Sequence, residues 1–84
     1  MSETFRLAQF LLAQSRQSGK TEGRSVMFRQ PLTHSQLATR IGTVREVVSR
    51  VMFRLQEQGL INADGRAITI PDREALERYA GERE

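Results

Sequence analysis

The sequence predicts a mainly helical α+β fold in one small domain of 84 residues. Three observations lead to this prediction. Apolar residues recur at helical spacing in several segments, two short helical segments meet at Gly42, and two β-rich runs flank the pair Asp64-Gly65. A chain of this length has room for one modest core, and neither an internal repeat nor a long linker divides it.

The first predicted helix covers residues 4–17, where apolar residues recur at helical spacing: Phe5, Ala8, Leu11 and Leu12. Either Ser2 or Thr4 caps its start. The following "SRQSGKTEGRS", residues 15–25, has the composition of a polar loop with two glycines. Residues 26–29, "VMFR", then predict a short edge strand, because they lie between that loop and Pro31.

A short helix with well-marked ends follows in "LTHSQLATRIG". Thr33 and Gln36 have the spacing of a capping box, and Leu32 can pack onto Leu37 as a hydrophobic staple. Gly42 supplies a left-handed exit from this helix.

The next helix is predicted over about residues 43–58. Thr43 and Glu46 have the spacing of a second capping box, and Gly59 ends the helix. Its apolar positions form one stripe: Val48, Val51, Met52 and Leu55.

The last part of the chain predicts a hairpin and a final helix. Residues 60–70 contain two β-rich runs around Asp64-Gly65, a strong signal for a tight hairpin. Asp72 caps a helix that docks through Leu76, Tyr79 and Ala80. Two helices joined at Gly42 and followed by a hairpin predict a winged helix-turn-helix with a small antiparallel β-wing, and residues 1–84 form this single domain.

Composition and charge narrow the class of protein. The chain has no cysteine, a formal charge of +3 and a pI near 10.6. Residues 29–54 hold five arginines and one glutamate, whereas residues 72–84 hold three arginines and five acidic residues. The concentrated positive charge favours an anionic partner. No apolar run is long enough for a membrane span, and the first residues lack the pattern of a signal peptide, so we expect a cytoplasmic protein without a membrane partner.

The polar face of residues 43–58 has the chemistry of a base-contacting helix. Four side chains near its start carry that interpretation: Arg45, Glu46, Ser49 and Arg50. Arginine donates a bidentate pair of hydrogen bonds to guanine, glutamate accepts from cytosine, and serine bonds to several bases. The alternative is an ordinary solvated face on which Glu46 pairs with Arg50. Phe53 has no role in either interpretation.

At residues 32–80, "LTHSQLATRIGTVREVVSRVMFRLQEQGLINADGRAITIPDREALERYA", the chain resembles the DNA-binding domain of the cyclic-AMP receptor protein and fumarate-nitrate regulator (Crp/Fnr) family. The likeness extends upstream to "RLAQFLLAQ" and so covers nearly the whole chain. Its most specific part is "REVVSR". This motif matches the base-contacting Arg-Glu and Arg of one branch at Arg45, Glu46 and Arg50, and the Glu-x-x-Ser-Arg of the other branch at Glu46, Ser49 and Arg50. The half-site therefore stays open between a TGTGA-like and a TTGAT-like core.

The resemblance also implies contacts to the DNA backbone. The expected phosphate-contacting residues lie at the helix starts, on the helix of residues 43–58 and in the wing: Thr33, His34, Thr43, Arg54, Gly65 and Arg66. Family members often carry a hydroxyl residue where this chain has Val44, and we expect Thr43 to take over that contact. His34 is alternatively a solvent-exposed residue of the first helical turn.

Partners and cofactors follow from the same resemblance. It implies double-stranded DNA as a partner, a homodimer in the full-length regulator, and contact with RNA polymerase. Family members carry a β-roll sensor domain and a dimerisation helix upstream, and neither is found in these 84 residues, which suggests a truncated chain or a bare domain. No cofactor is therefore expected in this chain, whether cyclic nucleotide, haem or iron-sulfur cluster.

Two other classes of function compete with DNA binding. An enzyme or a metal site is disfavoured, because the chain offers one histidine, His34, and lacks both a glycine-rich phosphate loop and metal-ligand spacing. A winged helix used as a protein-interaction module without sequence-specific DNA binding is the main alternative, with exposed Phe53 as its apolar candidate.

Overall fold

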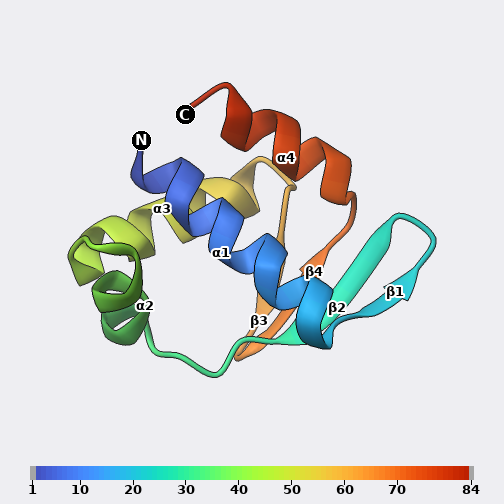
Figure 1. Cartoon of the computed structure of the whole chain (residues 1–84), viewed down its shortest axis with the longest axis horizontal. Helices are drawn as coiled ribbons and strands as arrows, with labels where there is room; N and C mark the ends of the chain where they lie inside the picture. Colours follow the sequence, from blue (N-terminus) through green and yellow to red (C-terminus); the bar gives the residue numbers. More distant parts are fainter. Residues whose placement is uncertain (1, 84) are drawn as a thin grey trace.

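The computed structural model describes residues 2–83 and confirms the mainly helical α+β fold, with helices and one antiparallel sheet (Figure 1). The elements follow in the order α1 (Glu3–Ser18), β1 (Lys20–Glu22), β2 (Ser25–Arg29), α2 (His34–Ile41), α3 (Arg45–Glu57), β3 (Asn62–Asp64), β4 (Ala67–Ile70) and α4 (Arg73–Gly81). The predicted helix-turn-helix is α2 and α3, and the predicted wing is the hairpin of β3 and β4.

Helix α1 is the central support of the domain. Ser2, not Thr4, caps it, since the Ser2 hydroxyl accepts a hydrogen bond of 3.1 Å from the Phe5 N–H. Thr4 is instead buried on the inner side of the first turn. The inward stripe also includes Leu7, which is fully buried and which the spacing of apolar residues did not single out.

The sheet corrects two predictions. Residues 15–25 are not a loop, because α1 continues to Ser18 and β1 occupies Lys20–Glu22. The strand order β1-β2-β4-β3 also makes β2 an inner strand, not an edge strand. Every residue of β1 is exposed, so this strand lacks the alternation of apolar and polar residues by which a half-buried strand is recognised. Pro31 lies beyond the end of β2 and therefore does not interrupt its ladder.

One face of the sheet covers the helices. Val26 and Phe28 of β2 are buried opposite Ile70 and Ile68 of β4. Met27, between them, points to the other face and is 55% exposed. The sheet is thus half-buried, with its apolar residues on the helical side.

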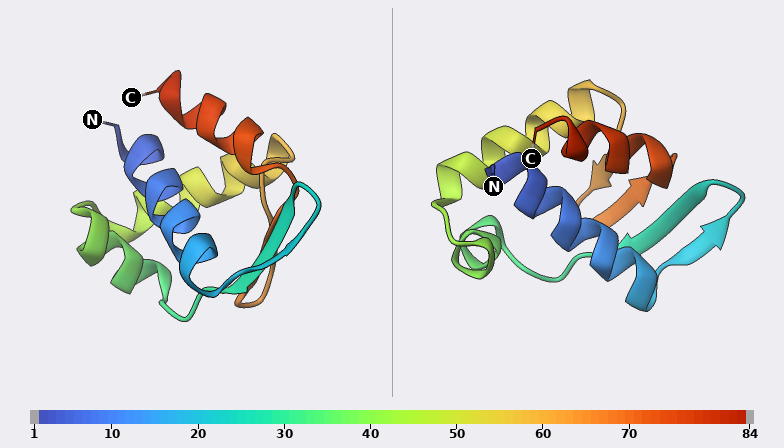
Figure 2. Two further views of the ribbon diagram at one scale, coloured as in Figure 1. Left: turned by 45° about the vertical axis from the view of Figure 1, so that its right-hand side comes forward. Right: turned by 45° about the horizontal axis from the view of Figure 1, so that its top comes forward.

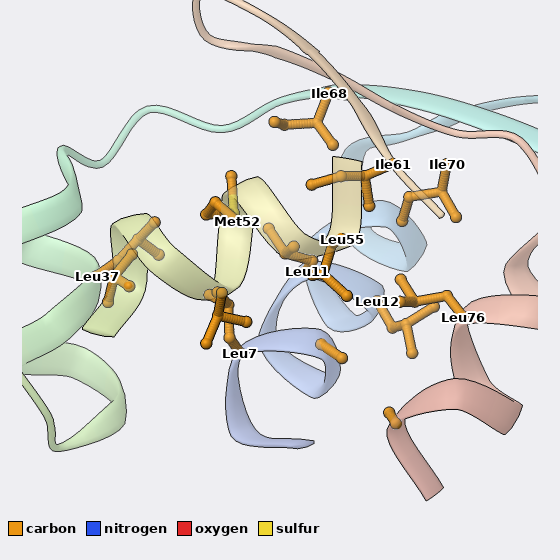
Figure 3. Close-up of a cluster of buried hydrophobic side chains, with 14 of the residues drawn as sticks. Leu7, Leu11, Leu12, Leu37, Met52, Leu55, Ile61, Ile68, Ile70 and Leu76 are labelled. Carbon is orange, nitrogen blue, oxygen red and sulfur yellow. The ribbon is translucent and has the colours of Figure 1, made fainter. Parts of the chain in front are cut away.

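The core joins all four helices to this inner face (Figure 3). The largest fully buried side chains come from every layer: Leu7, Leu11, Leu12, Val26, Leu37, Val48, Leu55, Ile68, Ile70 and Leu76. Helix α4, capped as predicted by the Asp72 carboxylate on the amides of Glu74 and Ala75, packs along α1. The start of α1 and the end of α4 consequently lie near each other in all three views (Figures 1 and 2).

A buried glutamine fixes the segment between β2 and α2. Gln30 is 5% exposed, and its side chain bonds twice to the backbone of Leu32. Its amide nitrogen donates to the Leu32 carbonyl at 2.6 Å, and its oxygen accepts from the Leu32 N–H at 2.7 Å. This ring of hydrogen bonds sets the path of the chain into the helix-turn-helix.

Gly19 is predicted to tolerate no side chain. A Cβ there would overlap the Ser15 carbonyl oxygen and Cγ2 of Val26, because α1 and β2 meet at this point. Gly19→Ala should lower the free energy of unfolding by about 1 to 3 kcal/mol, the usual cost of overpacking. Urea denaturation measures this change. Gly81→Ala is the control, since a Cβ at Gly81 meets open space; equal stability of the two variants would contradict the steric argument.

Replacing Gln30 by Met should also destabilise the fold. The substitution keeps a long side chain but removes both hydrogen bonds and leaves the backbone N–H and carbonyl of Leu32 without these partners. We expect a loss of about 1 to 3 kcal/mol in the free energy of unfolding. Gln17→Met on the exposed surface of α1 is the matched control and should stay within about 0.5 kcal/mol of the parent. Similar values for both variants would show that the buried pair of bonds contributes little.

Candidate nucleic-acid interface

The first helix of the motif, α2, begins as predicted. The Gln36 N–H donates to the Thr33 hydroxyl at 3.1 Å, and the Thr33 N–H donates to the Gln36 side-chain oxygen at 2.8 Å. This reciprocal capping box satisfies two amides that the helix itself leaves free. Leu32, just before the cap, packs against the core. The start of α2 is therefore held both by hydrogen bonds and by apolar packing.

The turn between α2 and α3 depends on Gly42. Its φ of 81° and ψ of 45° lie in the left-handed region, which a residue without Cβ adopts at little cost. The N–H groups of Gly42 and Thr43 both donate to the Ala38 carbonyl, at 2.9 and 2.8 Å. Ala38 itself is 3% exposed, so a small residue stands where α2 packs on α3.

The second capping box is absent, and this prediction is wrong. Helix α3 starts at Arg45 with Val44 as its N-cap, and no side chain caps it. The Thr43 N–H already donates to the Ala38 carbonyl, so it is not available to the Glu46 carboxylate, and α3 starts one residue later than predicted. Glu46 is then the second helical residue, one position too early for the box. Both Thr43 and Glu46 are left without the mutual bonds that the spacing predicted.

The inner face of α3 confirms the predicted apolar stripe. Its four members are 4% exposed or less: Val48, Val51, Met52 and Leu55. They meet Leu37 of α2 and the leucines of α1 in the core (Figure 3). The helix ends at Glu57, and Gly59 lies two residues beyond, close to the predicted end.

The outer face of α3 is charged and unpartnered. Arg45, Glu46, Arg50 and Arg54 are all exposed. Within residues 2–83 none of these four side chains has a hydrogen bond, an ion pair or a ring contact, so the Glu46–Arg50 pair of the solvated-face alternative is not formed. Phe53, on the same side of the helix, is 62% exposed. The face is thus free to meet a partner.

Ser49 and His34 are joined across the motif. The Ser49 hydroxyl lies 2.8 Å from Nδ1 of His34, although the two residues are 15 positions apart. Both side chains are half-buried. One predicted base-contacting residue therefore touches one predicted phosphate-contacting residue, and His34 is not the freely exposed residue of the alternative interpretation.

The wing is fastened to the segment that leads into α2. Asp64 and Ala67 pair directly, so that Gly65 and Arg66 form the exposed loop at the tip. A guanidinium N–H of Arg66 donates to the Pro31 carbonyl, and the Gln30 N–H donates to the Arg66 carbonyl at 2.8 Å. These bonds bring the tip of the wing next to the approach to Thr33.

Several of these contacts carry no sequence signal. The bond from His34 to Ser49 depends on how α2 crosses α3, which spacing along either helix does not fix. Gln30 stands before Pro31 in a polar stretch and is not recognisable as a buried residue. A helical wheel of α3 places Ser49 at the edge of the buried stripe, and that edge position is the one available hint of a partner within the fold.

A metal cluster or a membrane-spanning helix in the described part of the chain would indicate another class of site. Within residues 2–83 no three of the His, Cys, Asp and Glu side chains gather to hold a metal ion. Over the same residues no helix has both the length and the apolarity to span a membrane.

Comparison with known proteins agrees with this geometry. Residues 5–79 match the Crp-like helix-turn-helix domain family. Over 76 residues the chain is 33% identical to the transcriptional activator protein FnrA of Stutzerimonas stutzeri, covering 90% of this chain and 31% of that protein. It is 32% identical to the fumarate and nitrate reduction regulatory protein of Escherichia coli K12, with 90% of this chain and 30% of that protein covered.

Solved structures show the same fold. A transcriptional regulator of the CRP/FNR family from Thermus thermophilus aligns with all of this chain and 43% of its own, with a TM-score of 0.79 and 29% identity. A CooA mutant from Carboxydothermus hydrogenoformans aligns with 94% of this chain and 37% of its own, with a TM-score of 0.83 and 21% identity.

The chain spans about a third of the length of the two curated relatives. The family match and these relatives describe DNA-binding transcription regulators and not enzymes. The family match covers nearly the whole described chain, and the helix-turn-helix with its hairpin has been found where the sequence predicted it. This chain belongs to the family of Crp-like helix-turn-helix domains, the DNA-binding domains of transcription regulators.

Proposed function

We propose that this domain binds a specific DNA half-site by placing the outer face of α3 in the major groove. The observation that carries the proposal is that Arg45, Glu46, Arg50 and Arg54 are exposed without an intramolecular partner, on the second helix of the helix-turn-helix. Three exposed arginines without partners on one short helix add no contact that stabilises the fold. DNA is a polyanion whose major groove admits a helix, and all three arginines could bind its phosphates or bases there.

The base contacts are assigned to the first two turns of α3. Arg45 and Arg50 each offer a planar donor pair that fits O6 and N7 of guanine. Glu46 accepts from N4 of cytosine, and Ser49 bonds to a base at the edge of the contact. Since "REVVSR" satisfies both branches of the family, both TGTGA-like and TTGAT-like half-sites remain candidates.

The start of α3 suits a phosphate group. Val44 provides no side-chain cap, so the first amides of the helix keep their capacity to donate. The helix dipole adds positive potential at the same point. Thr43, half-buried and directly before the N-cap residue Val44, is assigned a phosphate contact through its hydroxyl.

Further phosphate contacts are assigned to the flanks of α3. Thr33 lies at the capped start of α2, Arg54 continues the outer face of α3, and Gly65 and Arg66 form the tip of the wing. Arg66 gives one guanidinium N–H to Pro31, and an arginine has five such donors, so others remain for a phosphate. His34 was expected to contact phosphate as well, and its bond to Ser49 leaves only Nε2 for that purpose.

The wider setting of the domain is part of the same proposal. The relatives are regulators about three times as long as the matched segment, so a regulator that pairs two such domains would dock them on half-sites about one helical turn apart. A homodimer, contact with RNA polymerase and action in the cytoplasm follow from this assignment. We propose no cofactor for the 84 residues themselves.

A protein-interaction module is the alternative function, and exposed Phe53 is the residue that favours it. Modules that bind protein need no phosphate contacts. Their binding to DNA would be weak and would not respond steeply to salt, which makes salt dependence the decisive measurement.

Affinity for a mixed-sequence DNA duplex should fall steeply with salt. Each neutralised phosphate contributes about 0.9 to the slope of log K against log salt concentration. A domain with contacts from α2, α3 and the wing should therefore lose affinity by orders of magnitude as salt is raised. Fluorescence anisotropy over a series of salt concentrations measures the slope. A flat response would reject DNA binding and favour the protein-interaction module.

Arg45→Ala and Arg50→Ala should each weaken binding to the selected half-site by about 1 to 3 kcal/mol and relax the preference at one base pair. Arg66→Ala should instead weaken all sequences similarly, because phosphates carry no base information. In-vitro selection of duplex DNA, followed by affinity measurement on each single-base variant, tests both statements. Arg78→Ala, an exposed arginine of α4 outside the motif, is the charge-matched control. If Arg50→Ala reduced affinity equally for specific and random DNA, Arg50 would not be a base contact.

A further inference from the structure

We infer that His34 is a positioning residue for Ser49. Its hydrogen bond decides whether the Ser49 hydroxyl donates to a DNA base or accepts from one, and therefore which base pair is preferred opposite Ser49. The inference rests on the proposed function and deepens it. Its basis is the 2.8 Å contact between His34 Nδ1 and Ser49 Oγ, which spans the turn of the helix-turn-helix. The resemblance to the family implied separate phosphate and base roles for these residues and no contact between them.

The backbone on both sides of this contact is held by the fold. His34 is the first residue of α2, directly after Thr33, whose two capping bonds fix the backbone there. Ser49 lies in the second turn of α3, one residue after fully buried Val48. Capping bonds and burial hold both backbones in place, so the rotation of the Ser49 hydroxyl hydrogen is the degree of freedom that His34 controls.

The numbers of donors and acceptors on the two side chains link the histidine to the base that Ser49 prefers. A serine hydroxyl has one hydrogen to donate, and a neutral imidazole donates at one nitrogen and accepts at the other. If Nδ1 carries the hydrogen, it donates to Ser49 Oγ, and the Ser49 hydrogen stays free for an acceptor such as O6 or N7 of guanine or O4 of thymine. If Nδ1 is bare, Ser49 donates to it, and its oxygen then accepts only from an amino group, on adenine or cytosine.

The second arrangement fits the proposed DNA complex better. With Nδ1 engaged by Ser49, Nε2 is the ring nitrogen left to face a phosphate, and it must carry the hydrogen to donate there. In a neutral ring this leaves Nδ1 as the acceptor from Ser49. Ser49 is then a hydrogen-bond acceptor, and we expect a base that presents an amino group at its position.

The experiment compares variants by in-vitro selection and by affinity for every single-base change in the selected half-site. His34→Phe keeps a ring but removes the bond to Ser49, and His34→Asn restores a polar group near the position of Nδ1. Ser49→Ala removes the other partner, and the double variant His34→Phe/Ser49→Ala completes a cycle. Ser35→Ala, on the exposed neighbour of His34, is the control. Thermal unfolding of each variant checks that the domain is folded, and His34→Ala replaces His34→Phe if the larger ring prevents folding.

The positioning role predicts a local loss of preference. His34→Phe should reduce discrimination between bases at one base pair by about 2- to 10-fold, the effect expected for one hydrogen bond. The affected base pair should be the one that Ser49→Ala also affects. The double variant should match Ser49→Ala alone, and His34→Asn should recover most of the preference. The preferred base at that position should be one that presents an amino group in the wild type.

Two results would overturn the inference. The first is that His34→Phe lowers affinity equally for all sequences, leaves the base preferences unchanged and lowers the slope of log K against log salt concentration by about 0.9. A simple phosphate contact would behave in this way. The other is an additive effect of the two substitutions at different base pairs. Failure of the proposed function would look different, because the wild-type domain would then select no half-site at all.

Discussion

The packing of α3 on α1 and α2 is the constraint on which the rest of the structure depends. Four side chains of α3 are almost fully buried against leucines of the other two helices: Val48, Val51, Met52 and Leu55. In a helix of 3.6 residues per turn, burying one stripe fixes the direction of every other side chain. The hydrophobic contacts that stabilise the domain therefore also direct Arg45, Glu46 and Arg50 to the solvent. Folding energy and the orientation of the proposed DNA-contacting face come from the same interaction.

Two further connections hold the flanks of this face in place. On one side, the Gly42 turn lets α2 approach α3 over the small side chain of Ala38. On the other, the backbone and side chain of Arg66 bond to the segment before α2, whose path Gln30 fixes from within. The tip of the wing is thereby coupled to the start of α2, while Ile68 and Ile70 of β4 anchor the wing in the core. Phosphate contacts proposed for the helix starts and for the wing thus share one rigid framework.

The sequence was a reliable guide where a local rule decides the structure. The Thr33 capping box, the exit at Gly42, the apolar stripe of α3 and the cap at Asp72 all follow from spacing within a few residues, and all were found. Predictions failed where contacts outside the recognised pattern decide the structure. Strand β1 is exposed throughout and exists because β2 offers a ladder, and the N-cap of α3 moved because Thr43 was already bonded to Ala38. The contact of His34 with Ser49 depends on the crossing of two helices, which no local pattern encodes. The assignment of individual residues to bases and phosphates stays a prediction.

The start of α3 departs from what a self-sufficient helix would have. A β-branched apolar residue, Val44, stands at the N-cap with 58% of its surface exposed, where a hydroxyl or amide side chain would stabilise the helix. The outward charges have no partners among the described residues, although Glu46 and Arg50 have a spacing that permits one. Both departures cost the free domain stability, and both would be offset in the proposed DNA complex, because a phosphate there would accept from the free amides and DNA would supply partners for the arginines. If the proposed function is correct, part of the stability of α3 is therefore coupled to DNA binding. By linkage, the domain should then be more stable when bound to DNA than when free.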